Sequence, residues 1–126
     1  MRNIWQIHRR VCRGKLHWKG SDRSVDERPV ILPASEQDLQ NAYDWYEERE
    51  PGVGERFLSR AASAFRRIQL NPDRYPVKIG RFRRSQIEIF PYSIFYTIEN
   101  GRVFIHAIYH HSRNPEALKR RLRKSL

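Results

Sequence analysis

Residues 94–110 read IFYTIENGRVFIHAIYH and form the most regular pattern of the sequence. Asn100-Gly101 lies between two runs rich in β-branched and aromatic side chains, and Asn-Gly in that setting is the strongest short-range signal for a β-hairpin. We therefore predict strands over residues 94–98 and 103–110, joined by a two-residue turn.

Both faces of this predicted hairpin are apolar. A two-residue turn sets the register of the strands, and side chains then alternate between the two faces. On the face that we expect helices to cover, Ile98 pairs with Val103, Tyr96 with Ile105, and Ile94 with Ala107. The opposite face is too apolar for one that meets only water. It carries Phe95, Thr97, Phe104, His106, Ile108 and His110.

An amphipathic helix is predicted upstream, between Ser35 and Pro51. Ser35 and Asp38 form an S-x-x-D pattern, which is typical of a capped helix start. The outer side, which includes Glu47, is charged and indicates a solvated surface. Its apolar positions have helical spacing and are Leu39, Ala42, Tyr43 and Tyr46.

A second helix is predicted from about Gly54 to Leu70, since Asn71 precedes Pro72 and a residue before proline disfavours helical backbone. The short break between the helices indicates an antiparallel helical hairpin. Residues 29–33 predict an edge strand because prolines flank an apolar run, and alternation over residues 86–89 predicts another strand. The second helix buries Phe57, Ala61, Phe65 and Ile68.

The end of the chain predicts a short basic helix that begins at Asn114-Pro115. Leu118 and Leu122 would anchor it among Lys and Arg side chains. The order of elements then gives an α+β fold, in which a helical hairpin packs on one face of a small antiparallel sheet.

Charge is concentrated at the two ends of the chain. Of 126 residues, 25 are Lys or Arg and 14 are Asp or Glu, for a net charge of +11. Residues 78–126 carry 11 basic and 3 acidic side chains, and residues 1–28 carry 8 and 3. A field of this sign favours nucleic acid, an acidic protein or an anionic surface as partner.

Several function classes are excluded by what the chain lacks. Cys12 is the only cysteine, so the sequence holds no disulfide framework and no cysteine zinc site. It has no glycine-rich phosphate loop, H-E-x-x-H pattern or nucleophile elbow, and we expect no metal and no cofactor. No apolar run is long enough to span a membrane. We expect a cytoplasmic protein without a membrane partner.

Residues 1–28 differ in character from residues 29–126, which we expect to form the functional domain. This basic N-terminal extension has three interpretations that its sequence leaves open. It is an arm that folds on a partner, a weakly ordered extension, or the product of a misplaced translation start, for which Val25 or Val30 would serve.

The order and spacing of several motifs resemble the RelE/ParE superfamily of toxins, over about residues 29–121. The first helix region LPASEQDL with YDWYE, the PGVGERFL entry to the second helix, and FPYSIFY carry the resemblance. Asn71-Pro72, Arg83-Arg84, residues 103–110, Arg113-Asn114-Pro115 and Arg121 complete it.

This resemblance implies a toxin of a bacterial type II toxin–antitoxin module, of the ParE-like, plasmid-stabilisation kind. A cognate antitoxin would neutralise it by wrapping a segment around it. ParE-like members poison DNA gyrase, whereas RelE-like members cleave messenger RNA on the ribosome. Gyrase is the target that we expect, and a nucleic-acid-binding module without catalysis is a third hypothesis.

A metal-independent ribonuclease would need a base, an acid and cations around one phosphate. His106 and His110 share a predicted face but lie about 13 Å apart along it, which is too far to serve one phosphate. This incomplete set favours a gyrase poison, which needs no catalytic residues. If the chain were a ribonuclease, the candidates are Arg81, Arg83, Arg84, His110 and Arg113.

The sequence predicts two binding surfaces, one for the antitoxin and one for the target. An antitoxin with apolar anchors and acidic flanks should dock on the outer sheet face, at Phe95, Phe104, His106 and Ile108. The basic helix should contact the target, through Lys119, Arg120, Arg121, Arg123 and Lys124.

Overall fold

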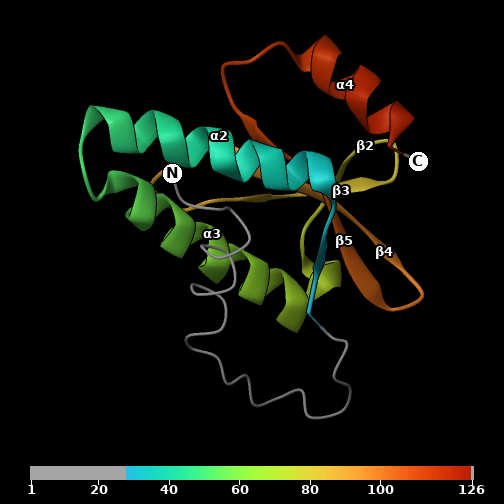
Figure 1. Cartoon of the computed structure of the whole chain (residues 1–126). Helices are drawn as coiled ribbons and strands as arrows, with labels where there is room; N and C mark the ends of the chain where they lie inside the picture. Colours follow the sequence, from blue (N-terminus) through green and yellow to red (C-terminus); the bar gives the residue numbers. More distant parts are fainter. Residues whose placement is uncertain (1–27, 126) are drawn as a thin grey trace.

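The computed structural model describes residues 28–125, and the predictions made for residues 1–27 lie outside this range. A helical hairpin, a sheet and a further helix follow one another along the chain (Figure 1). The elements are β1 (Val30–Ile31), α2 (Pro33–Arg49), α3 (Val53–Leu70), the short 3₁₀ helix η1 (Pro72–Arg74), β2 (Val77–Ile79), β3 (Phe82–Gln86), β4 (Tyr92–Glu99), β5 (Arg102–His110) and α4 (Pro115–Lys124).

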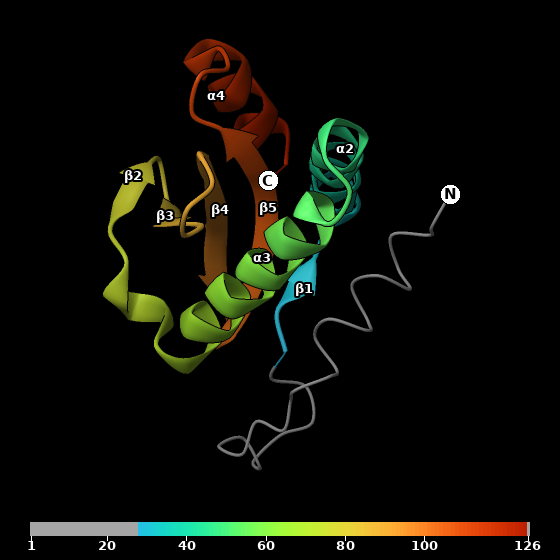
Figure 2. The same cartoon turned by 90° about the vertical axis from the view of Figure 1, so that its left-hand side faces the viewer.

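The predicted α+β architecture is confirmed, with five strands in the order β1-β5-β4-β3-β2. Figure 2 shows α3 crossing in front of the sheet beside α2, with α4 apart from both. The sheet face that packs against α2 and α3 is called the hairpin face, and the face that packs against α4 is called the α4 face. Each face has its own apolar cluster, so the sheet is covered on both sides.

The strands of the sheet differ in part from the prediction. The predicted edge strand is present as β1, but it runs parallel to β5, so the sheet is mixed. The strand predicted over residues 86–89 lies earlier, at β3, because the buried Phe90 holds residues 87–91 in a loop between β3 and β4. β2 was not predicted and pairs with β3 at the other edge.

The register of β4 and β5 follows the prediction from the turn as far as Tyr96, which lies opposite Ile105. Beyond it the register shifts, because His106 is an extra residue in β5 and forms a bulge. Phe95 therefore lies opposite Ala107, and Ile94 opposite Ile108, so the predicted Ile94–Ala107 pair is wrong.

The bulge exchanges the faces of the last residues of β5. Ile108, predicted for the outer face, belongs to the main core under α2 and α3. Ala107, predicted for the hairpin face, lies with Phe95 and Tyr109 in the cluster under α4.

The start of α2 also differs from the prediction. Leu32 is the N-cap, Pro33 occupies the first position of the helix, and no side chain within residues 28–125 caps it. Ser35 is buried and donates a hydrogen bond to the Ile105 carbonyl at 3.0 Å. The S-x-x-D pattern therefore joins the helix to the sheet instead of capping the helix. The predicted burial of Leu39 is confirmed, as is that of Ala42 and Tyr43.

Glu47 was interpreted as a solvated residue, but it organises the turn between the helices. Its carboxylate accepts hydrogen bonds from the Gly52 and Gly54 amides, at 3.0 and 2.9 Å. It thereby satisfies free amides at the start of α3. A Cβ on Gly54 would lie 2.8 Å from the Tyr43 carbonyl oxygen, so the two helices approach closely only because residue 54 is glycine.

Candidate partner-binding surface

The C-terminal helix α4 is held on the sheet by one apolar side. Asn114 accepts a hydrogen bond from the Glu116 amide at 2.8 Å and caps the helix. Leu118 and Leu122 are buried, and they pack with Phe82 and Phe95 of the sheet. The face that α4 turns to solvent is therefore its basic one.

An ion pair fixes the position of α4 relative to α2. Arg121 donates to both carboxylate oxygens of Asp38, at 3.0 and 2.7 Å, and also to the His106 carbonyl at 3.1 Å. Asp38 additionally accepts a hydrogen bond from the Ile108 amide at 2.9 Å. Both partners thus satisfy backbone groups at the β5 bulge, where the regular ladder is interrupted.

His106 forms a second link between the sheet and α4. Its Nε2 lies 3.0 Å from Thr97 Oγ1, whose hydroxyl donates to Glu99, and its Nδ1 contacts the Ser125 hydroxyl. This pattern suits a neutral ring that carries its proton on Nε2. Burial lowers the pKa of His106, the Glu99 carboxylate raises it, and the Arg81 guanidinium lowers it. The net direction is down, which also favours the neutral ring.

Among the residues predicted to contact the target, Arg121 has a structural partner in Asp38. The other four have their side chains at the outer surface of α4, and among contacts within residues 28–125 only Lys119 of these four is paired, with Glu116 at 3.6 Å. These four are Lys119, Arg120, Arg123 and Lys124. They are called the basic face of α4 below.

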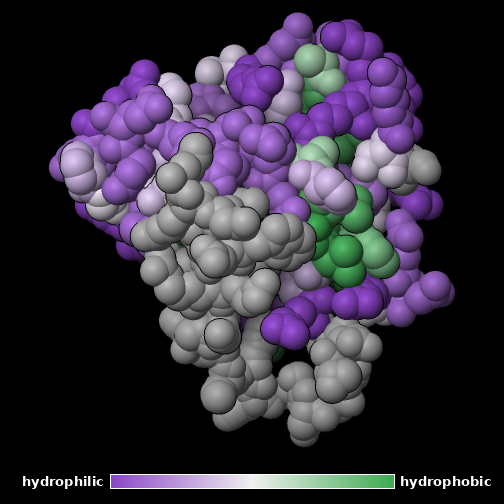
Figure 3. Space-filling view, viewed as in Figure 1, coloured by the Kyte–Doolittle hydropathy of each residue, from purple (hydrophilic) through white to green (hydrophobic). Residues whose placement is uncertain are grey.

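The residues predicted to bind the antitoxin do not share one exposed face. Phe95 and His106 are buried beneath α4, and the bulge places Ile108 in the main core. Phe104 alone stays half-buried, in register with Val30 of β1. Figure 3 shows apolar surface in this region, just below the N-terminal end of α2.

The ribonuclease candidates are spread over the sheet. Arg81 pairs with Glu99 at 3.1 Å, and Arg83 donates to the Tyr75 carbonyl at 2.6 Å. Arg83 and Arg84 are neighbours in β3 and therefore point to opposite faces. The five side chains do not converge on one point.

His110 and Arg113 lie near the far end of β5. The His110 ring packs edge-on against Tyr92 and accepts a hydrogen bond from the Ser112 amide, while Arg113 stacks over Tyr109. His111, which follows His110 in the chain, contacts the Ser93 hydroxyl at 2.9 Å. Tyr92 and Ser93 are adjacent in β4, so the two histidines lie on opposite sides of the strand.

Within residues 28–125, no three His, Cys, Asp or Glu side chains lie close enough to hold a metal ion. No helix in the same range is long and apolar enough to cross a membrane.

Comparison with known proteins identifies the family. Residues 30–115 match the family described as the ParE toxin of the type II toxin–antitoxin system, parDE. A chain from a solved structure, "Chromosomal ParDE TA system from P. aeruginosa", shares the fold with a TM-score of 0.60. The two are 16% identical, over 65% of this chain and 92% of that chain. No curated protein is similar enough in sequence to count as a relative. Because the family match spans more than half of its residues, this chain belongs to the ParE toxins of type II toxin–antitoxin systems.

Proposed function

We propose that this toxin poisons DNA gyrase in the cytoplasm by binding it through the basic face of α4. The observation that carries the proposal is that one set of residues in α4 holds the helix on the domain while another set faces solvent. Leu118, Leu122 and Arg121 hold the helix on the domain, which leaves four cationic side chains on a rigid support. A rigid, pre-positioned helix loses little entropy when it binds a partner.

A gyrase poison of this kind needs no chemistry of its own. Positive charge on α4 speeds encounter with gyrase and its bound DNA through long-range attraction. Part of this charge also stabilises α4, since cations near a helix C-terminus interact favourably with the helix dipole. We place the toxin function in the domain formed by residues 29–126.

The alternative target is messenger RNA on the ribosome. Such a ribonuclease would rely on cations around one phosphate, whereas Arg81 and Arg83 are engaged with Glu99 and Tyr75. That engagement favours the gyrase proposal. The two targets are separated by adding the purified toxin to a gyrase supercoiling reaction and to a translation extract. The proposal expects loss of supercoiling and intact messages, and cut messages with normal supercoiling would refute it.

We propose further that an antitoxin neutralises the toxin by docking on the α4 face beside β1. Phe104 supplies the apolar contact there, and the half-buried Arg102 supplies positive charge. An antitoxin segment with apolar anchors and acidic flanks fits this combination. Changing Phe104 to Asp should weaken antitoxin binding with little change in melting temperature. A large fall in melting temperature with unchanged affinity would refute the assignment.

A further inference from the structure

In the loop between β3 and β4, both the backbone conformation and the solvent exposure of Ile89 are unfavourable for an isoleucine. Ile89 has a φ of +75°, a left-handed conformation that is an outlier for a β-branched side chain. Its side chain is also 73% exposed. Within residues 28–125, the other non-glycine residue with positive φ is Asn100, which tolerates this conformation well.

The surroundings show why the backbone is held in this conformation. Phe90 is buried and packs edge-on against Tyr46 and Phe57, which draws the loop toward the helices. The Ile87 amide donates to the Tyr92 carbonyl at 3.0 Å and closes the loop. Ile89 is left at the tip, and Asn or Gly at this position would close the same loop without strain. At 73% exposure, the isoleucine buries little apolar surface in the isolated chain.

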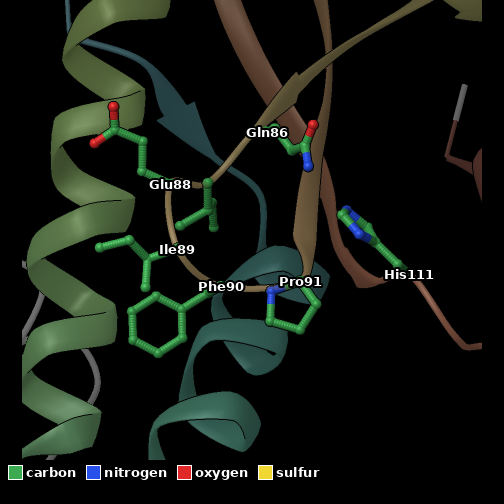
Figure 4. A pocket seen from close by; sticks show the side chains of 7 residues that line it. Gln86, Glu88, Ile89, Phe90, Pro91 and His111 are labelled. Atoms are coloured by element: carbon green, nitrogen blue, oxygen red, sulfur yellow. The ribbon is translucent and has the colours of Figure 1, made fainter.

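The loop forms one side of an open pocket at the surface. Residues 86–91 and His111 line it, and Figure 4 shows Ile89 and Phe90 beside α3, with His111 on the other side of Pro91. An exposed apolar tip next to a pocket is typical of a binding surface.

The rim of this surface is mostly basic. Arg60 of α3 pairs with Glu88 at 3.1 Å, which neutralises the carboxylate in the loop. Exposed Arg56 lies one helical turn before Arg60, on the same side of α3. Beyond Pro91, Arg84 is close enough to His111 to lower its pKa, although burial lowers that pKa more. Positive charge therefore flanks the tip on both sides.

We propose that Ile89 is an anchor for the antitoxin, and that an acidic segment of the antitoxin with apolar side chains covers the loop between β3 and β4. This inference rests on the proposed function, since it takes the antitoxin as partner. The basic rim selects an acidic partner, and the strain at Ile89 is retained because the side chain makes its contacts only in the complex. This contact is separate from the one at Phe104 of β5.

The test compares Ile89→Asn with Leu70→Asn. Leu70 is a matched control because it is 71% exposed, apolar and lies at the end of α3, away from this loop. Each purified toxin is titrated with the purified antitoxin of its own module, its melting temperature is measured, and its expression is tested for growth arrest without antitoxin. Ile89→Gly is a second variant that accepts the same backbone conformation.

We expect Ile89→Asn and Ile89→Gly to weaken antitoxin binding about tenfold, with growth arrest retained and the melting temperature not lowered. Leu70→Asn should leave affinity unchanged. Unchanged affinity in both Ile89 variants would overturn the proposal. A lower melting temperature in every Ile89 variant that loses affinity would also overturn it, because the loss of binding would then follow from loss of stability. Loss of growth arrest with intact antitoxin affinity would assign the loop to the target instead, and would also overturn it. Failure of the unaltered toxin to inhibit gyrase would refute the proposed target but leave the affinity comparison valid.

Discussion

The Asp38 carboxylate receives two hydrogen bonds from the Arg121 guanidinium across 83 positions of sequence. The pair joins the first turns of α2 to the last turns of α4, and it forms where the β5 bulge leaves the Ile108 amide and the His106 carbonyl in need of partners. The Arg121 side chain is 28% exposed and that of Asp38 is 10% exposed, so the pair is partly shielded from water. The Asp38–Arg121 pair therefore fixes the position of the basic face of α4 relative to the rest of the domain.

Replacing Arg121 with Met should lower the free energy of unfolding by about 2 kcal/mol, because the partly shielded Asp38 carboxylate would lose its cationic partner. Arg120→Met is the matched control, since Arg120 is the exposed neighbour on the same helix. Urea unfolding of both variants measures the difference. Equal stabilities for the two variants would show that the pair contributes no net free energy.

The toxin should lose stability as the pH falls below about 6.5, in part through His106. Burial lowers the pKa of this ring in the folded chain below its ordinary value of 6.5. The unfolded chain therefore binds the proton first, and the stability due to the neutral ring is lost as the pH falls toward the folded pKa. Unfolding free energies at pH 7.5 and pH 5 should differ more for the unaltered chain than for His106→Gln. The same difference in both proteins would contradict this role of His106.

Gly54→Ala should destabilise the helical hairpin by about 2 kcal/mol. The added Cβ would meet the Tyr43 carbonyl oxygen at 2.8 Å and the Glu47 carboxylate at 2.7 Å, so α2 and α3 would have to separate. Ser59→Ala, at an exposed position of the same helix, is the control and should change little. Thermal unfolding of both variants tests this, and a Gly54→Ala protein as stable as the control would show that the helices have room to move apart.

The helices and the hairpin could be predicted because their signals are local. Asn100-Gly101 gives the turn, and the spacing from Leu39 to Tyr43 gives the buried side of α2. The bulge at His106 could not be predicted, since no local pattern distinguishes one extra residue from regular alternation. A single shift of register moved Ile108 into the core and removed it from the expected antitoxin surface.

Contacts between residues far apart in sequence could not be predicted either. Ser35 and Asp38 have the spacing of a capping motif, and only the folded chain shows that their partners are Ile105 and Arg121. In the same way Arg121 could not be told apart from the other basic residues of α4 by sequence. The strain at Ile89 depends on how Phe90 packs, which sequence patterns do not encode.

The proposed role of α4 is tested by measuring gyrase inhibition by a toxin whose α4 has lost its basic face. In the test variant four residues are changed to Gln: Lys119, Arg120, Arg123 and Lys124. In the control variant an equal number of charges is removed outside α4, at Arg56, Arg66, Arg67 and Arg74. We expect the test variant to need at least about tenfold more protein to inhibit supercoiling, with its melting temperature close to that of the unaltered toxin. The control should inhibit normally. A test variant that is folded and inhibits gyrase as well as the unaltered toxin would show that gyrase is not bound through the basic face of α4.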